Sequence, residues 1–413
     1  MERPWFAHYD EGVTREAGYP EGPVWHLLER SAREYPKARA VEFLGFTMSY
    51  AQVWRDSLRF AGALRAMGVK PGDRVALMLP NSPQYVVAFY GALEAGATLV
   101  NTSPLYTPRE LSEQLKDSGA ETLVILDLLW PTYEKVKDEV PVKRVITTGV
   151  QDYLPFPKNL LFPIKVKREG RWVNLPSDPR RHDFKRLLKT HGPLEQPHTG
   201  SLDDVALLQY TGGTTGTPKG AMLTHRNLLA NAHQVLAWLG DRLEPGGEVV
   251  LAVIPFFHIY GVVAGLLVGV SLGARMVLMP RPDYKMMVKA IEKQRATIFP
   301  GVPTMFIGLN NYPGIQGRNL KSLKFCVSAA APLPLEVSRQ FEQLTGAKLV
   351  EGYGLTEASP TTHINPIYGK RKEGSIGLPL PSLDARIVDP NQVELPLGEV
   401  GELAVQGPNV MKG

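Results

Sequence analysis

Apolar residues recur at two different spacings along this chain, and the two spacings alternate. In residues 23–35 and 50–67, apolar side chains lie three and four positions apart, which places them on one face of a helix. Short apolar runs such as RVALMLP (74–80) and ETLVILD (121–127) are typical of strands that are buried on both faces. Strands that alternate with helices of this length predict βαβ units built around parallel sheets.

The same pattern predicts most of the other elements. We expect further strands at 40–45, 97–103, 143–149, 205–210, 249–254, 274–279, 297–299, 323–328 and 348–353. We expect further helices at 84–96, 108–119, 224–239, 261–272, 283–294 and 334–345, with Thr224 as an N-cap and Gly96 as a helix stop. Residues 151–200 show no sustained period and indicate a long surface insertion. Beyond Pro379, the segments 384–389, 392–396 and 401–407 predict short strands of a small β unit.

Composition narrows the class of protein. The 413 residues are 44% hydrophobic, which is enough for a substantial core. The single cysteine, Cys326, excludes intrachain disulfides and a multi-cysteine zinc site, and its place in an apolar strand predicts a buried residue rather than a nucleophile. The N-terminus lacks a signal-peptide pattern, and the longest apolar stretch, 262–270, is about half of the ~20 residues that a membrane-spanning helix needs. We therefore expect a cytoplasmic protein.

The net charge of +5 is concentrated in one segment. Residues 158–189 contain ten Lys and Arg side chains against Glu169, Asp178 and Asp183, so the rest of the chain is close to neutral. This asymmetry argues against a nucleic-acid-binding protein. The basic and aromatic segment 153–189 could contact anionic lipid at the inner face of the cell membrane. A solvated surface insertion is the alternative, and the sequence favours it slightly.

The most informative segment is the loop TGGTTGTPKG, residues 211–220, between a predicted strand and a predicted helix. It holds four glycines, four threonines and Lys219. Glycines let backbone N–H groups approach an anion, hydroxyls add hydrogen bonds, and the lysine adds positive charge for phosphates. An ordinary turn needs only one or two glycines. The P-loop pattern of nucleoside triphosphatases fails, because Pro218 precedes Lys219 and Gly220 follows it.

This loop resembles the signature of the adenylate-forming, acyl-activating superfamily, and its TGGTTG form resembles bacterial long-chain fatty acid–CoA ligases. Three more segments resemble motifs of that family in the expected order: PFFHIYG (255–261), SAAAPLP (328–334) and EGYGLTE (351–357). The resemblance covers nearly all of the chain. It implies an α/β fold with two helix-flanked, mainly parallel sheets and the start of a small β-barrel.

The resemblance also implies roles for individual residues. His258 would lie beside the substrate carboxylate, Thr356 would contact the α-phosphate, and Lys219 would bind phosphate, so these three are the candidate catalytic residues. Glu357, with Thr211, would hold Mg²⁺. The candidate ATP- and AMP-binding residues are Thr211, Gly212, Gly213, Thr214, Thr215, Gly216, Thr217, Lys219, Ala331, Glu351, Gly352, Tyr353, Gly354 and Thr356. The candidate acyl-binding residues are His258, Val262, Ala330, Ala331 and Gly354.

Each of these residues also has a purely structural interpretation. From the residues alone, His258 would more often be a histidine of the core, and the family motif is what favours a site. Ala330 and Ala331 could equally be core alanines. Glu357 could be a surface carboxylate, and Tyr353 could be a packing aromatic.

The resemblance divides the chain into three segments. Residues 20–200 are expected to form a first α/β unit with the 151–200 insertion, residues 201–350 a second α/β unit with the phosphate loop, and residues 351–413 the nucleotide motif and β-barrel strands. In the family, a ribose-binding aspartate, a hinge and a small C-terminal lid domain with a catalytic lysine follow this point. We therefore expect this chain to bind ATP or acyl-AMP weakly and to turn over slowly.

The implied reaction activates a fatty acid, expected to be long-chain, with ATP to acyl-AMP and pyrophosphate, and then transfers the acyl group to coenzyme A. One alternative is an adenylation domain that loads a carrier protein with an acyl or aminoacyl group. Another is a catalytically incomplete nucleotide- or acyl-binding module. The sequence leaves open chain-length preference and whether the protein forms a homodimer.

Overall fold

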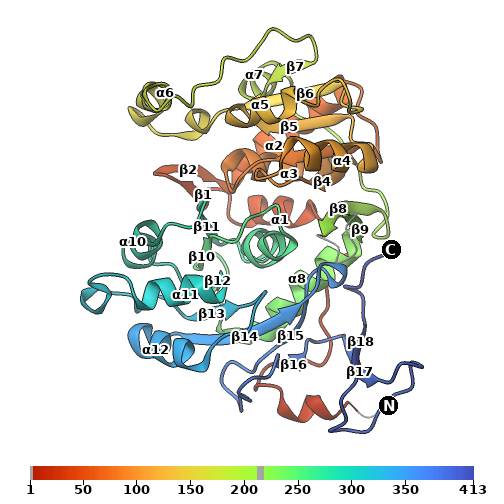
Figure 1. Ribbon diagram of the computed structural model, residues 1–413, viewed down its shortest axis with the longest axis vertical. Coiled ribbons are helices and arrows are strands. Elements are labelled where there is room, and N and C mark those ends of the chain that lie inside the picture. The colour runs from red at the N-terminus through yellow and green to blue at the C-terminus, as the bar shows by residue number, and fades with distance from the viewer. Residues whose placement is uncertain (1–2, 212–217) are drawn as a thin grey trace.

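The computed structural model describes residues 3–211 and 218–413. Two large β-sheets and the helices around them make up most of the described chain (Figure 1). The main core lies between the two sheets, and two smaller cores lie on their outer faces. The α/β class expected from the alternating pattern is confirmed, since most neighbouring strands in both sheets run parallel.

The smaller sheet has seven strands in the order β7-β6-β5-β3-β4-β8-β9. Among the described strands of this sheet, only β9 runs antiparallel to its neighbour, β8. The strands are β3 (Arg74–Met78), β4 (Thr98–Asn101), β5 (Thr122–Leu126), β6 (Arg144–Thr148), β7 (Arg181–Asp183), β8 (Val205–Thr211) and β9 (Lys219–Thr224).

The larger sheet has nine strands in the order β16-β15-β14-β13-β12-β10-β11-β1-β2. Antiparallel pairs occur only toward its two edges among the described strands. The strands are β1 (Arg39–Phe43), β2 (Phe46–Ser49), β10 (Val249–Ala252), β11 (Arg275–Leu278), β12 (Ile298–Gly301), β13 (Phe325–Ser328), β14 (Lys348–Gly354), β15 (Thr361–Ile364) and β16 (Leu378–Pro379).

Helices fill the space between the sheets and cover their outer faces. Every residue of α3 is buried, which explains why its sequence is mostly apolar around the helix. Thr224 caps α8 in a reciprocal capping box with Asn227, as the sequence predicts. The α-helices are α1 (His26–Glu34), α2 (Tyr50–Ala66), α3 (Pro83–Glu94), α4 (Pro108–Ser118), α5 (Trp130–Glu134), α6 (Lys158–Arg168), α7 (Phe184–Thr190), α8 (His225–Leu239), α9 (Val268–Ser271), α10 (Tyr284–Gln294), α11 (Pro303–Asn310) and α12 (Leu335–Thr345).

The expected helix at 261–272 has two parts. Its first part is a π-helix, η5 (Gly261–Leu267), and α9 completes it. Cys326 is buried in β13, as predicted, and burial raises the pKa of its thiol. Among residues 3–211 and 218–413, no helix combines the length and the apolar character needed to cross a membrane.

The structure corrects several expectations. The 151–200 segment is not only an irregular insertion, because it contains α6, α7 and β7, and β7 adds an edge strand to the seven-stranded sheet. Of the three strands expected after Pro379, β17 (Asp384–Val388) and β18 (Glu402–Gln406) form a two-stranded sheet. Residues 392–396 contribute a single bridge, and these described strands close no barrel. The sheets also exchange strands between the expected segments: β1 and β2 join the larger sheet, and β8 and β9 join the smaller one.

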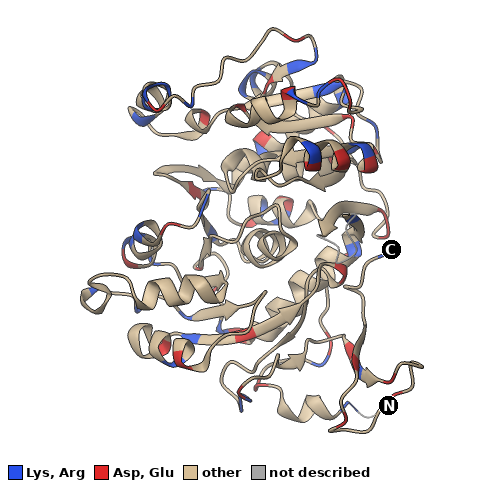
Figure 2. Ribbon diagram, in the orientation of Figure 1, with Lys and Arg blue, Asp and Glu red and all other residues tan. Residues whose placement is uncertain are grey.

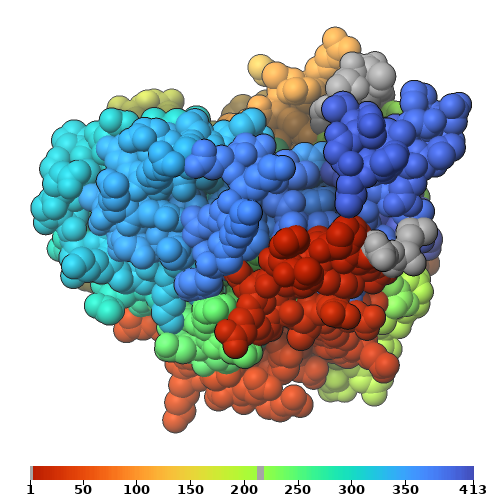
Figure 3. Space-filling model, turned by 90° about the horizontal axis from the view of Figure 1, so that it is seen from below, coloured from red at the N-terminus to blue at the C-terminus, as the bar shows by residue number. Residues whose placement is uncertain are grey.

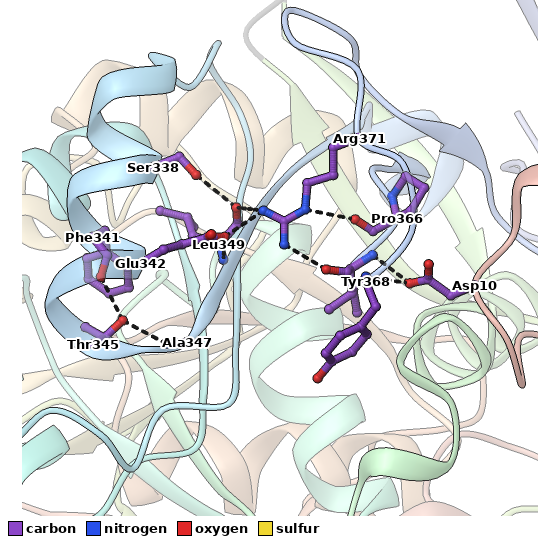
Figure 4. A network of polar contacts seen from close by, with 11 residues as sticks. Asp10, Ser338, Phe341, Glu342, Thr345, Ala347, Leu349, Pro366, Tyr368 and Arg371 are labelled. Atoms are coloured by element: carbon purple, nitrogen blue, oxygen red, sulfur yellow. Dashed lines mark hydrogen bonds and ion pairs between the residues drawn. The ribbon is translucent and has the colours of Figure 1, made fainter.

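The N-terminal segment lies against the C-terminal part of the chain (Figure 3). Arg3 forms an ion pair with Asp384 at 2.6 Å, and the Tyr9 hydroxyl donates to the Pro379 carbonyl at 2.6 Å. The buried Asp10 carboxylate accepts the backbone N–H groups of residues 367–369 (Figure 4). Arg371 continues this network to Glu342 on α12, at 2.6 Å. The N-terminal segment therefore helps to fix the strands that carry the 351–357 motif.

Candidate active site

A cavity of about 650 Å³ opens beyond the carboxyl ends of β10, β12 and β13 and beside the end of β14. Ligands of open α/β sheets commonly bind at this edge. Seven residues singled out in the sequence line it: Thr211, His258, Ala330, Gly352, Tyr353, Gly354 and Thr356. The cavity extends inward to Trp238 and Ile367, which are 1% and 2% exposed. Its walls are mostly apolar, and no Asp, Glu, Lys or Arg lines it within the described part of the chain.

His258 reaches the cavity from the loop between β10 and η5. Its backbone N–H donates to the Pro255 carbonyl at 3.0 Å, which closes a tight turn. Gly261 is required next to this turn, because a Cβ there would lie 2.2 Å from the Pro255 carbonyl oxygen. Partial burial lowers the pKa of His258 below its ordinary value of about 6.5. The ring is therefore mainly neutral at pH 7 and can donate one hydrogen bond to a carboxylate.

A buried polar network holds the two residues before His258. Asn81 accepts the Phe256 N–H at 2.7 Å and donates to the Ala252 and Ile254 carbonyls. Tyr85 and Asn101 both donate to the Phe256 carbonyl, at 2.8 and 3.1 Å. This network joins strands of the seven-stranded sheet to a loop of the nine-stranded sheet, so it fixes the position of His258.

Gln209 completes the network. It accepts from Asn101 at 2.9 Å and donates to the Phe257 carbonyl at 2.9 Å, and it also lines the cavity. The sequence interpretation missed Asn81, Tyr85, Asn101 and Gln209. The available signal was a polar residue at or just after the carboxyl end of an apolar strand, in VALMLPN, TLVN and VALLQ.

The 351–357 motif forms the end of β14 and the short helix η7 (Thr356–Ala358). Tyr353 is 39% exposed, and its ring meets the His363 ring edge-on at 6.2 Å between centroids, which leaves a face available to a planar ligand. Gly354 lies against the backbone, because a Cβ would come 2.0 Å from the Pro360 carbonyl oxygen. Ala330, from the 328–334 segment, has φ of 69°, a left-handed conformation that is uncommon for a residue other than glycine.

The phosphate-loop residues Gly212, Gly213, Thr214, Thr215, Gly216 and Thr217 lie outside the described residues. The loop begins and ends on the antiparallel pair β8–β9, where Thr211 and Lys219 are register partners. Thr211 lines the cavity and Lys219 is exposed beside it. The hairpin therefore holds both ends of the loop at the mouth of the cavity.

Glu357 lies in η7, which packs against β9. The Glu357 carbonyl accepts the Met411 N–H at 2.7 Å, and residues 412–413 pair with Met222 on β9. These bonds keep the motif beside the hairpin that carries Thr211. Among the described residues, no group of three or more His, Cys, Asp or Glu side chains could hold a metal ion.

Several predicted site residues do not line the cavity. Val262 is fully buried in η5, and Ala331 is exposed next to Ala330. The Glu351 carboxylate accepts the Leu333 N–H at 3.3 Å, so it braces the 328–334 segment. Lys219 and Glu357 lie beside the cavity rather than in its wall. Their roles toward substrate remain predictions.

The two-sheet fold and the cavity at the strand ends define an α/β protein that binds a ligand at the carboxyl edge of its sheets. Comparison with known proteins shows the family. A family model for AMP-binding enzymes matches residues 28–413, and the chain belongs to this family. Over its whole length it is 44% identical to the long-chain-fatty-acid–CoA ligase of Bacillus subtilis (strain 168) and 40% identical to that of Escherichia coli O157:H7. It spans 74% of the length of each of these relatives.

Solved structures agree with this assignment. A long-chain-fatty-acid–CoA ligase from Archaeoglobus fulgidus superposes with a TM-score of 0.82 at 25% identity, over 98% of this chain and 78% of that one. ATP-bound MatB from Rhodopseudomonas palustris superposes with a TM-score of 0.79 at 27% identity, over 94% of this chain and 71% of that one. The expected adenylate-forming fold is thereby confirmed.

Proposed function

We propose that this chain carries the site where a long-chain fatty acid reacts with ATP, and that the acyl group then passes to coenzyme A. In the first step a carboxylate oxygen attacks the α-phosphorus, and the bond to pyrophosphate breaks. In the second step the coenzyme A sulfur attacks the acyl carbonyl carbon, and AMP leaves. The relatives named long-chain-fatty-acid–CoA ligase support this reaction.

One observation carries the choice of acid. The wall of the cavity is apolar, and it contains no Asp, Glu, Lys or Arg among the described residues. An amino acid would bring an ammonium group into this space, and a buried charge without a partner is costly. A fatty acyl chain needs no such partner, and burying each CH₂ contributes about 0.8 kcal/mol. The cavity therefore favours fatty acids over the aminoacyl alternative.

The chain's own residues have separate tasks in this proposal. Neutral His258 donates a hydrogen bond to the carboxylate and orients it, and Thr356 hydrogen-bonds the α-phosphate. The face of Tyr353 packs against adenine, and Gly354 lets the nucleotide approach the backbone. Lys219 and the 211–217 loop bind the outer phosphates. Glu357 and Thr211 would hold Mg²⁺, which offsets the repulsion between the two reacting anions.

Binding of stable acyl-adenylate analogues tests this proposal on the chain as it stands. We expect acyl-sulfamoyl-adenosines from butanoyl to hexadecanoyl to bind with affinity rising about fourfold per CH₂ until the cavity is filled, as measured by calorimetry. The leucyl analogue, with its ammonium group, is the matched control and should bind more weakly than an acyl analogue of equal size. Affinity independent of chain length, or preference for the leucyl analogue, would contradict the proposal.

A further inference from the structure

Helix α6 and the turn before it expose an unusual amount of apolar surface. Phe156, Leu160, Leu161 and Ile164 are 80%, 60%, 56% and 52% exposed. In α6, Val166 alone is buried, so few of its side chains contribute to the core of the protein. Figure 1 shows α6 at the margin of the molecule, beyond the β2 edge of the larger sheet. Apolar side chains grouped on a protruding helix indicate a surface with a partner.

The exposed apolar residues share one face of the helix. At 100° per residue, Leu160, Leu161 and Ile164 fall within one sector, about opposite to the side that carries Phe162 and Val166. Arg168 falls in the same sector, and Leu161 at its edge also lines a groove beside α6. Phe162 is partly buried against the main core, and Val166 is buried. The helix is thus held to the protein by one apolar face while a second apolar face points outward. Packing against the core explains the face with Phe162 and Val166. It does not explain why the face with Leu160 and Ile164 is apolar.

Positive charge flanks the outward face. Residues 156–172 contain Lys158, Lys165, Lys167, Arg168 and Arg171 against a single carboxylate, Glu169, which pairs with Lys165 and Arg171 (Figure 2). Lys158, Leu161 and Lys165 of α6 line a groove of about 720 Å³ together with Lys289 of α10 and Glu42. Three lysines against one carboxylate leave the described lining of this groove with a net positive charge.

We propose that Phe156 and the outward face of α6 dock this protein on an anionic lipid bilayer. An interfacial helix presents an apolar face to the acyl boundary and basic side chains to the headgroups, and α6 carries both. Each lysine or arginine near an anionic surface adds to the attraction, and salt weakens it. The centre of a protein–protein interface is depleted of lysine, whereas Lys165 and Lys167 border this face. This inference goes beyond the proposed reaction and stands independently of it.

Vesicle co-sedimentation of the 413-residue chain tests the proposal directly. The protein should sediment with vesicles of phosphatidylcholine and phosphatidylglycerol, sediment much less with phosphatidylcholine alone, and return to the supernatant as salt is raised. Protein that stays in the supernatant with anionic vesicles at low salt would overturn the proposal. Because no nucleotide or fatty acid is added, the result does not depend on the acyl-adenylate analogues binding.

A matched pair of variants separates this surface from general hydrophobicity. The triple variant Phe156→Ser, Leu160→Ser, Ile164→Ser should lose at least tenfold in vesicle affinity. The control variant Val393→Ser, Leu397→Ser, Val400→Ser removes side chains that are 60%, 89% and 96% exposed elsewhere, and it should bind like the wild type. Thermal unfolding shows whether each variant is folded, and the single variant Leu160→Ser replaces the triple variant if that one is not.

A charge variant and a mass measurement complete the test. Lys167→Glu with Arg168→Glu should reduce binding to anionic vesicles and leave the weak binding to neutral vesicles unchanged. If the α6 triple variant sediments like the wild type, the proposal is wrong. It is also wrong if light scattering shows a dimer that this variant dissociates while vesicle binding persists, because the face would then cover a second copy of the chain.

Discussion

Tyr353 is the residue in the candidate site whose aromatic ring is proposed to pack against adenine. It lies at the end of β14 with 39% of its surface exposed, and it lines the cavity. Its contact with His363 is edge-on, so one ring face is free of that neighbour. A ring in this setting can pack against a purine, and such contacts contribute about 1–3 kcal/mol per base in other proteins.

Replacing Tyr353 therefore gives a prediction for a single residue. Tyr353→Ala should weaken the acyl-adenylate analogue about tenfold or more, whereas Tyr353→Phe keeps the ring and should bind within about twofold of the wild type. Calorimetric titration measures both. Equal affinity of the alanine variant and the wild type would show that adenine does not use this ring.

The predicted site residues that line the cavity come from motifs dense in special residues, and their roles toward substrate stay predictions. The sequence is informative at 211–220 and at 351–357. Both segments concentrate glycines and polar residues within a few positions. Ala331 and Val262 could not be separated from the nearby lining residues Ala330 and Tyr260 without knowing which way each side chain points. Whether a side chain faces the cavity depends on the turn of the backbone, as the left-handed Ala330 shows.

The loop between β10 and η5 depends on polar side chains from other elements. Asn101 is 2% exposed, accepts the Tyr85 hydroxyl at 2.7 Å, and donates to Gln209 and Phe256. Burying a polar group without its partner costs about 1–3 kcal/mol. The position of His258 therefore depends on a residue that touches no substrate in the proposed reaction.

Asn101→Leu should lower the free energy of unfolding by about 2 kcal/mol and also weaken the long-chain analogue, because the 255–258 turn loses a support. The matched control is Asn311→Leu. Asn311 is exposed, and its side chain donates to the Ile307 carbonyl of the preceding helix at 2.8 Å. Urea denaturation and calorimetry give both values. If Asn101→Leu loses stability but binds the analogue normally, the network does not position the site.

At the scale of elements, apolar periodicity predicted strands and helices well where one pattern persisted. It missed β2 and β9, which return antiparallel beside the strands before them, and it missed α6, whose apolar residues lie on two faces. It also gave no sign that β1 and β8 would join sheets outside their own segments. Strand exchange of this kind is set by tertiary packing, which local spacing does not encode.

Across the whole molecule, buried histidines link stability to pH. Burial lowers the pKa of His225 to about 4 and that of His363 to about 4, from about 6.5 in an unfolded chain. The folded state then disfavours the protonated ring, so this contribution to stability is complete above pH 6.5 and falls as the pH drops toward 4. The buried Glu94 has a raised pKa and acts in the opposite direction.

A single variant isolates one histidine from these opposing effects. Between pH 7 and pH 5, His225 should account for about 2 kcal/mol of lost stability. His225→Asn keeps an acceptor for the Val24 N–H, which lies 3.1 Å from the imidazole Nδ1, and removes the titration. Its loss of stability over that interval, from urea denaturation, should be about 2 kcal/mol smaller than in the wild type. Parallel pH profiles would show that His225 does not titrate as its burial implies.

The assignment of the cavity to an acyl-adenylate is the central claim, and a crystal structure with hexadecanoyl-sulfamoyl-adenosine tests it most directly. We predict that adenine packs on Tyr353, that the sulfamoyl group lies near Thr356 and His258, and that the acyl chain runs inward toward Trp238. An acyl chain bound outside this cavity, or an adenine bound away from Tyr353, would contradict the account.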